Sequence, residues 1–179
     1  MTGRNLEAVY TAEEIGRRVG ELGGEISRDY EGEVPIVVSI LKGSVIFLAD
    51  LMRSISIPVH LDFMSITSFA GNRKPGGVVR ILKDIDLPVS ARPVIIVEDI
   101  IDTGLTAGYL VKSIQARDPK SLHVCALLDR QVRRLVQLPL RYVGFEIPDQ
   151  YLVGYGLDHH EIYRNLPYLA RLPEEENAG

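Results

Sequence analysis

VIIVEDIIDTGLTAG, residues 94–108, joins an apolar run to an acidic turn. The first four residues are all β-branched, as is typical of a strand that is buried on both faces. We predict a strand over residues 93–97, a loop over 98–105 and a helix from Thr106 to about Ala116. A buried strand that leads through a short loop into a helix is part of a βαβ unit, so this segment favours a parallel sheet.

Strand and helix patterns alternate along the rest of the chain. A capping box at Thr11 to Glu14 begins an amphipathic helix that continues to about Tyr30. Further predicted elements are strands at 34–41, 59–66, 122–128 and 142–145 and a helix at 44–52. We therefore predict an α/β fold with a mainly parallel twisted sheet flanked by helices. SFAGNRKPGGVV, residues 68–79, predicts a mobile loop or an open hairpin.

The composition is that of a globular protein with one domain. The chain has 179 residues, of which 46% are hydrophobic and 25% charged. Its formal net charge of −4 gives no general attraction to nucleic acid or to an acidic membrane, so we expect neither partner. MTGRNLEAVY at the N-terminus lacks the blocks of a signal peptide, and we expect a cytoplasmic protein. Cys125 lies in an apolar run and is interpreted as a buried, inert thiol.

The acidic turn after the strand has the chemistry of a phosphate and metal site. Ligands of open α/β sheets bind at the carboxyl ends of strands, and this turn lies at such an end. Residues 102–106 offer backbone N–H groups, two hydroxyls and Gly104 at a helix N-terminus, which favours an anion. Adjacent Glu98 and Asp99 repel one another unless a cation lies nearby, and hard oxygen ligands suit Mg²⁺ shared with a phosphorylated substrate. The alternative is a plain helix cap beside solvated acids.

The full string resembles the phosphoribosyl pyrophosphate (PRPP) signature of type I phosphoribosyltransferases: an apolar strand, two acids, two apolar residues, then Asp-Thr-Gly-x-Thr. The resemblance implies the fold of that family, with a small hood formed by terminal segments. It implies one domain over 1–172, with a core at about 34–130, a hood from about 1–20 and 140–170, and an acidic disordered tail at 173–179. It also implies that PRPP is bound by Glu98, Asp99, Asp102, Thr103, Gly104, Leu105 and Thr106, with Glu98 and Asp99 at Mg²⁺.

Two further segments narrow the resemblance to the hypoxanthine-guanine phosphoribosyltransferases. SILKGSVIFLADL, residues 39–51, is similar to their pyrophosphate-binding loop, which implies binding by Lys42 and Gly43 and a cis Leu41-Lys42 bond. DFMSITSF, residues 62–69, resembles the strand that enters their flexible lid, with Ser68-Phe69 where Ser-Tyr is usual. A lone Lys-Gly pair at a turn usually has no binding role. These segments therefore count as evidence for the family only together with the PRPP signature.

VGFEIPDQYLVGYGLDHHEIYRNL, residues 143–166, is similar to the family's purine-binding segment. The resemblance implies that Tyr151 stacks on the purine and that the Leu152 backbone bonds the base edge. It further implies that Asp158 helps to hold a second Mg²⁺ and that Arg164 contacts the departing pyrophosphate. Taken singly, these side chains also fit half-buried packing, a helix cap and a surface charge. The histidine pair at 159–160 is interpreted as surface residues.

One position departs from the family. ALLDR, residues 126–130, matches the strand whose terminal lysine donates to the purine 6-oxo group, and here that position is Arg130. A guanidinium is longer and planar, so the preference among hypoxanthine, guanine and xanthine stays open. A donor at this point still favours 6-oxopurines over adenine.

The implied activity is purine salvage. The enzyme would transfer the 5-phosphoribosyl group from PRPP to N9 of hypoxanthine or guanine, giving IMP or GMP and pyrophosphate. Asp102 is similar in position to the family's general base at N7. The family also suggests a homodimer or homotetramer. The alternative is a PRPP-responsive regulator of pyrimidine operons that binds mRNA, which would need a basic surface and whose family lacks an aspartate at the position of Asp102.

Overall fold

Six strands form the central sheet of the computed structural model, which describes residues 6–69 and 78–173. The strands are β2 (Ile36–Leu41), β3 (His60–Phe69), β4 (Val78–Lys83), β5 (Pro93–Ile101), β6 (Ser121–Asp129) and β7 (Leu140–Glu146). Their spatial order is β4-β3-β2-β5-β6-β7, and all neighbours are parallel except β3 and β4. After β4 the chain returns to β5 on the other side of β2. The boundary between β2 and β5 is therefore the topological switch point, where open α/β sheets bind their ligands.

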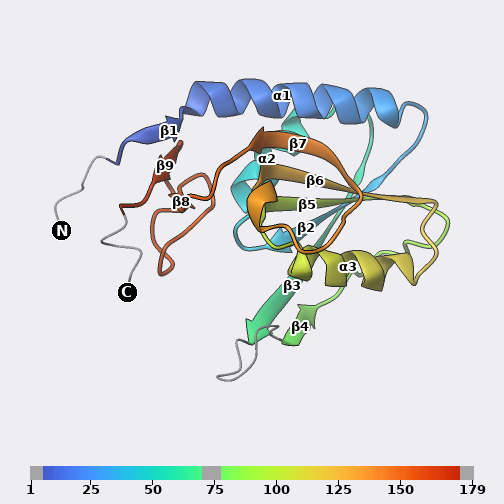
Figure 1. Ribbon diagram of the computed structural model, residues 1–179. Coiled ribbons are helices and arrows are strands. Elements are labelled where there is room, and N and C mark those ends of the chain that lie inside the picture. Colours follow the sequence, from blue (N-terminus) through green and yellow to red (C-terminus); the bar gives the residue numbers. More distant parts are fainter. Residues whose placement is uncertain (1–5, 70–77, 174–179) are drawn as a thin grey trace.

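Helices cover both faces of this sheet (Figure 1). They are α1 (Ala12–Asp29) and α2 (Val45–Ser54) on one face and α3 (Leu105–Gln115) on the other. Residues of β5 alternate between the two cores. Ile95 and Val97 pack with α1 and α2, whereas Val94 and Ile96 pack with α3. Burial on both faces explains why this strand reads as an unbroken β-branched run.

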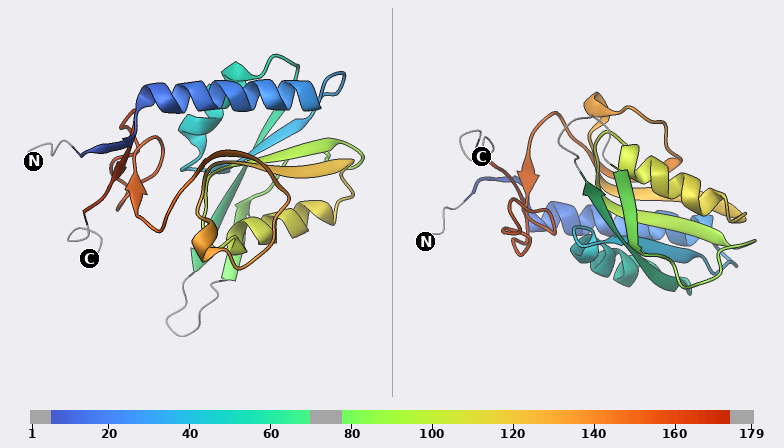
Figure 2. Two further views of the ribbon diagram at one scale, coloured as in Figure 1. Left: turned by 45° about the horizontal axis from the view of Figure 1, so that its top comes forward. Right: turned by 90° about the horizontal axis from the view of Figure 1, so that it is seen from below.

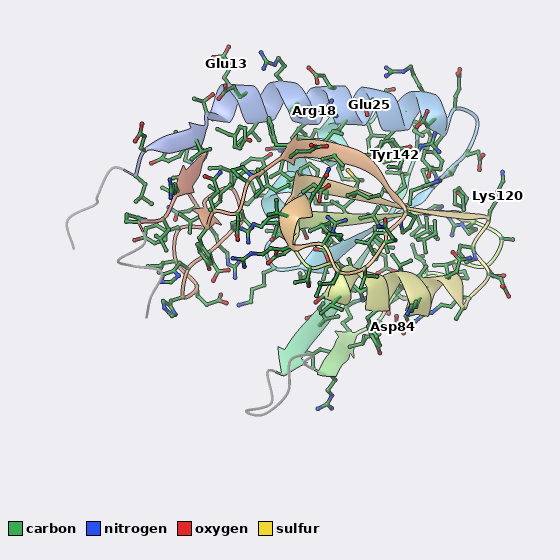
Figure 3. The ribbon with its side chains drawn as sticks, viewed as in Figure 1. Glu13, Arg18, Glu25, Asp84, Lys120 and Tyr142 are labelled. Atoms are coloured by element: carbon green, nitrogen blue, oxygen red, sulfur yellow. The ribbon has the colours of Figure 1, made fainter. Side chains whose placement is uncertain are left out.

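Side-chain contacts fix α1 at its start and against β7. The predicted capping box is present, because Thr11 Oγ1 accepts from the Glu14 N–H and Glu14 Oε2 accepts from the Thr11 N–H. Arg18 lies between α1 and β7 in Figure 3 and donates to the carbonyls of Val143 and Gly144 at 2.8 and 3.1 Å. The guanidinium thus holds the edge strand β7 against α1.

In the described part of the chain, no helix has both the length and the apolar character that a membrane crossing requires.

A second sheet of order β1-β9-β8 lies at one end of the central sheet (Figures 1 and 2). Its strands are β1 (Ala8–Tyr10), β8 (Leu152–Val153) and β9 (Leu169–Arg171). Strand β1 and residues 151–171, which include β8 and β9, are called the hood below. Segments from both ends of the chain therefore meet in one small sheet. The predicted fold class, including a hood of terminal segments, is confirmed.

The structure corrects several predicted boundaries. The loop predicted from Glu98 is wrong at its start, because β5 continues to Ile101 and remains paired with β6 through Glu98, Ile100 and Ile101. The segment at 68–79 is entered and left by an antiparallel pair, β3 and β4, which agrees with the open-hairpin alternative. No sequence pattern predicted β1, β8 and β9, since each has only two or three residues.

Candidate active site

The loops after β2 and β5 meet at the switch point and line a cavity of about 270 Å³. Gly43 contributes from the β2 side and lies so close to Asp99 that a Cβ would come within 1.7 Å of the Asp99 Oδ2 atom. The Leu41-Lys42 bond just before it is cis, as the resemblance implied. The β5 side contributes Glu98, Asp99, Asp102, Thr103, Gly104 and Thr106. Most of the predicted PRPP-binding residues therefore converge on one cavity.

Glu98 and Asp99 place two carboxylates in this cavity at the end of β5. Glu98 is only 8% exposed, and its burial together with the Asp99 charge raises the pKa of its carboxyl well above the usual value. Burial also raises the pKa of Asp99, although the Ile100 N–H donates to its Oδ1 at 2.7 Å. Among the described residues, neither carboxylate forms an ion pair, although the Arg164 charge opposes the rise in the pKa of Asp99. Ionisation of both groups therefore calls for a cation.

The phosphate loop, residues 102–106, enters α3 through a left-handed turn. Gly104 has φ 79°, a conformation that side chains rarely adopt. The space beside it is filled, because a Cβ at this position would lie 3.0 Å from Arg134 Cδ and 3.2 Å from the Val136 carbonyl oxygen. Glycine is thus required both by the turn and by its neighbours.

The segment after β6 clamps this phosphate loop. Arg134 Nε donates to the Asp102 carbonyl at 3.2 Å, and the same guanidinium forms an ion pair with Asp129. The Leu135 N–H donates to the Thr103 carbonyl at 2.8 Å. Arg134 was not among the predicted site residues. The sequence shows two adjacent arginines at 133 and 134, and therefore positive charge in this segment. Only the fold shows that Arg134 contacts the phosphate loop.

A second cavity of about 270 Å³ shares Asp99 and Asp102 with the first. Its walls come from the end of β5, from the residues that directly follow β5 and β6, and from the hood: Asp99, Ile100, Asp102, Arg130, Tyr151, Leu152, Leu157 and Asp158. It combines apolar and aromatic side chains with a few polar groups, which suits a planar heteroaromatic ligand. The two cavities therefore adjoin one another at Asp99, Ile100 and Asp102.

Arg130 and Asp102 are neighbours in this second cavity. Arg130 is 6% exposed, its Nη2 donates to the Gln150 carbonyl, and its Nη1 lies 3.4 Å from Asp102 Oδ2. Two buried polar atoms, Arg130 Nε and Asp102 Oδ1, have no hydrogen-bond partner among the residues that the structure describes. Unpaired buried polar atoms are rare, and such atoms are available to a ligand.

Tyr151 is part of a small aromatic group on the hood. Its hydroxyl donates to the Asp158 carbonyl at 3.0 Å, and the His159 ring lies edge-on at a centroid distance of 5.6 Å. His160 follows, with its ring 4.1 Å from that of His159. His160 is exposed as predicted, whereas His159 is half-buried and packs on the predicted purine platform. The sequence did not predict that His159 packs on Tyr151, because the turn determines the direction in which each of the two adjacent side chains points.

The two predicted pyrophosphate-binding cations are linked by a residue that was not predicted. Lys42 Nζ lies 2.8 Å from Glu161 Oε2, and Arg164 Nη2 lies 3.2 Å from Glu161 Oε1. Arg164 also pairs with Asp158 at 2.8 Å and donates to the Gly156 carbonyl at 2.8 Å. A Cβ at Gly156 would lie 2.0 Å from the Gly43 carbonyl oxygen. The hood therefore touches the pyrophosphate-binding loop directly.

Lys42, Leu105 and Arg164 are not among the residues that line the two cavities. The Leu105 side chain is exposed in the first turn of α3. Ser68 and Phe69 lie in β3, where they pair with Val79 and Val78. Their side chains and the predicted lid at 70–77 lie outside the described residues.

The donor set fits Mg²⁺ shared with a substrate. Among the described residues, no group of three or more His, Cys, Asp and Glu side chains is arranged to hold a metal ion alone. Two carboxylates with raised pKa values, buried Glu98 and half-buried Asp99, nevertheless line one cavity. Mg²⁺ is commonly bound through one or two carboxylates, substrate phosphates and retained waters, which matches such an incomplete set.

Comparison with known proteins identifies the family. The sequence model of the phosphoribosyl transferase domain matches residues 5–160. Hypoxanthine-guanine phosphoribosyltransferase from Dictyostelium discoideum is 44% identical over 173 residues, which cover 94% of this chain and 96% of that protein. This chain belongs to the hypoxanthine-guanine phosphoribosyltransferase family.

Solved structures of hypoxanthine-guanine phosphoribosyltransferases agree with the fold described above. The enzyme from Bacillus anthracis, which has a HEPES molecule in its active site, superimposes with a TM-score of 0.89 at 45% identity over 93% of this chain and 98% of that chain. A hypoxanthine phosphoribosyltransferase from Staphylococcus aureus gives a TM-score of 0.93 at 38% identity and covers all of both chains. The predicted membership of this transferase family is confirmed.

Proposed function

We propose that the protein is a purine salvage enzyme that transfers the 5-phosphoribosyl group from PRPP to N9 of hypoxanthine or guanine. The products are IMP or GMP and pyrophosphate. One observation carries this proposal: the phosphate loop, the acidic pair and the arginine-aromatic cavity adjoin one another at the switch point. The phosphate loop and the acidic pair would bind PRPP, and the arginine-aromatic cavity would bind a 6-oxopurine.

PRPP fits the cavity between β2 and β5. Backbone N–H groups and hydroxyls of residues 102–106 would hold its 5'-phosphate at the N-terminus of α3. Lys42, Gly43 and Arg164 would hold the pyrophosphate group, with the two side chains supplying positive charge. Glu98 and Asp99 would lie beneath the ribose hydroxyls. Their position at the end of β5 is fixed by the sheet, so the ribose is oriented before reaction.

The purine fits the second cavity. Tyr151 would stack on the ring face, the Leu152 backbone would bond the base edge, and Arg130 would donate to the 6-oxo oxygen. Adenine presents a donor at the same position and would meet the guanidinium unfavourably. The substrate class proposed here is therefore the 6-oxopurines.

The chemical step exchanges one bond at the anomeric carbon for another. The bond from C1' to the pyrophosphate oxygen breaks, its electron pair leaves with pyrophosphate, and N9 of the base bonds to C1'. Asp102 would take the proton from N7 as N9 attacks, since its carboxylate lies on the wall shared by both cavities. Lys42 and Arg164 would stabilise the charge on the leaving group.

Glu98, Asp99 and Asp158 are the residues that would hold Mg²⁺. When bound, Mg²⁺ neutralises pyrophosphate charge in the site. The family further suggests Ser68 and Phe69 as part of a lid, and a homodimer or homotetramer in the cytoplasm. We also retain the proposal of one domain over 1–172 with a short acidic tail.

Turnover with a panel of bases tests the proposed function. The protein is incubated with Mg²⁺ and PRPP, and hypoxanthine, guanine, xanthine, adenine and uracil are offered separately. We expect nucleoside monophosphate from 6-oxopurines and none from adenine or uracil. Turnover of uracil alone would instead support the regulator of pyrimidine operons, and no turnover with any base would refute the proposed activity.

A further inference from the structure

Glu161 occupies the two cations that we assign to pyrophosphate. Its Oε2 lies 2.8 Å from Lys42 Nζ and its Oε1 lies 3.2 Å from Arg164 Nη2. One carboxylate therefore bridges a lysine of the β2 loop and an arginine of the hood. Pyrophosphate would use the same two side chains, and it also presents anionic oxygens. Glu161 and pyrophosphate would thus compete for the same two cationic side chains, Lys42 and Arg164.

Backbone contacts hold Glu161 in this position independently of its side chain. The Glu161 N–H donates to Asp158 Oδ2 at 2.9 Å, and His159 and Ile162 exchange two backbone hydrogen bonds of 3.1 Å. Three non-glycine residues of this turn have positive φ, namely His160 at 50°, Glu161 at 65° and Tyr163 at 77°. Such conformations are uncommon and unfavourable for side-chain-bearing residues. The turn holds them in place and directs the carboxylate to the cations.

Glu161 is exposed in both of its contacts, whereas Arg164 is also held by partners other than Glu161. Lys42 and Glu161 side chains are 68% and 64% exposed, so water screens their attraction. Arg164 is anchored separately by Asp158 and by the Gly156 carbonyl, and its buried Nε has no partner among the described residues. A multiply charged ligand can therefore displace Glu161 without disturbing Arg164.

We propose that Glu161 is an internal counter-anion that competes with the pyrophosphate group of PRPP and with the pyrophosphate product. This inference rests on the proposed function and adds an affinity-setting residue to it. In this structure the carboxylate pairs with Lys42 and Arg164. PRPP must displace it, which weakens apparent binding by the fraction of protein in which the cations are paired. After reaction the same carboxylate favours departure of pyrophosphate.

The substitution Glu161→Gln removes the competing charge but keeps the size of the side chain and the backbone contacts of the turn. Glu31→Gln is the matched control, because it makes the same change in net charge at an exposed residue that follows the C-terminal end of α1. Titration calorimetry with Mg²⁺ present measures the Kd of PRPP and, separately, of pyrophosphate alone. We expect Glu161→Gln to bind both about threefold to tenfold more tightly, as removal of weak surface pairs implies. The control should equal the unmodified protein.

The direction of the change separates this inference from other roles. A residue that merely supports the turn would weaken binding when it is altered, and thermal unfolding reports that loss. Glu161→Asp retains the charge on a shorter side chain and should give a smaller gain. In a Lys42→Met background the gain from Glu161→Gln should shrink. Unchanged or weaker binding by Glu161→Gln overturns the inference, whereas failure of the unmodified protein to bind PRPP at all overturns the proposed function.

Discussion

Arg130 Nη1 lies 3.4 Å from Asp102 Oδ2, so the proposed 6-oxo donor and the proposed general base form an ion pair across the second cavity. The guanidinium is held on its other side by the Gln150 carbonyl. Arg130 therefore has two roles: it lines the predicted purine cavity and it orients the aspartate. A lysine at this position has one nitrogen and could not make both contacts with a fixed planar group.

Arg130→Met should lower kcat/KM for hypoxanthine by about tenfold to a hundredfold, because a hydrogen bond to a charged group contributes about 1.5–3 kcal/mol. Initial rates with hypoxanthine and PRPP measure the change. Arg133→Met is the matched control, since Arg133 also lies near Asp102, at 3.8 Å, but is half exposed and does not line the second cavity. Equal losses in the two variants would assign the effect to general charge near Asp102.

Asp102→Asn should reduce kcat by about a hundredfold to ten-thousandfold while the Kd of PRPP stays largely unchanged, as loss of a general base predicts. The variant keeps the shape of the side chain and can still meet Arg130 through its amide oxygen. Single-turnover rates and PRPP titration measure the two quantities separately. If PRPP affinity and turnover fall together, Asp102 acts in binding and not as the base.

Gly43→Ala should lower kcat/KM by about a hundredfold, because a Cβ at this position overlaps Asp99 Oδ2 and displaces one of the two acids from its place. PRPP titration should report weaker binding as well. Gly20→Ala is the contrasting control: nothing lies within 4 Å of a Cβ there, and Gly20 is inside α1. That substitution should leave activity intact and raise the free energy of unfolding by about 0.5–1 kcal/mol in a urea titration.

The site residues that the sequence predicted are those of continuous segments. Val94 to Gly108 carries the buried strand, the acids and the glycine turn in one string, so both fold class and phosphate loop could be predicted from it. Its strand boundary was wrong because acids are poor strand residues, yet pairing of Glu98 and Ile100 with β6 extends β5. Hydrogen bonding to the neighbouring strand outweighed the low strand propensity of these acidic residues.

The residues that the sequence missed act through contacts between distant segments. Arg134 reaches the phosphate loop from the segment after β6, and Glu161 reaches Lys42 across more than a hundred residues of chain. The turn at Glu161 has positive φ at residues other than glycine, which no local sequence pattern announces. These contacts follow from the hood meeting the sheet and could not be read from spacing.

His123 provides a pH test of the core that is independent of catalysis. Burial, and then the nearby Arg141 charge, lower the pKa of His123, while Asp29 acts in the opposite direction. Its Nδ1 lies 3.0 Å from the Tyr30 hydroxyl. Below the ordinary histidine pKa of about 6.5, the unfolded chain binds a proton that the folded protein does not, so the free energy of unfolding must fall as pH decreases through this window.

Urea unfolding of the unmodified protein and of His123→Gln at pH 7.5 and 5.5 measures this contribution. We expect the loss of stability on acidification to be smaller in His123→Gln, because glutamine cannot take up the proton in either state. His60→Gln is the matched control, since His60 is exposed at the start of β3. Substitution of His60 should leave the pH dependence of the unmodified protein in place. The same dependence in all three proteins would mean that groups other than His123 carry the acid sensitivity of the fold.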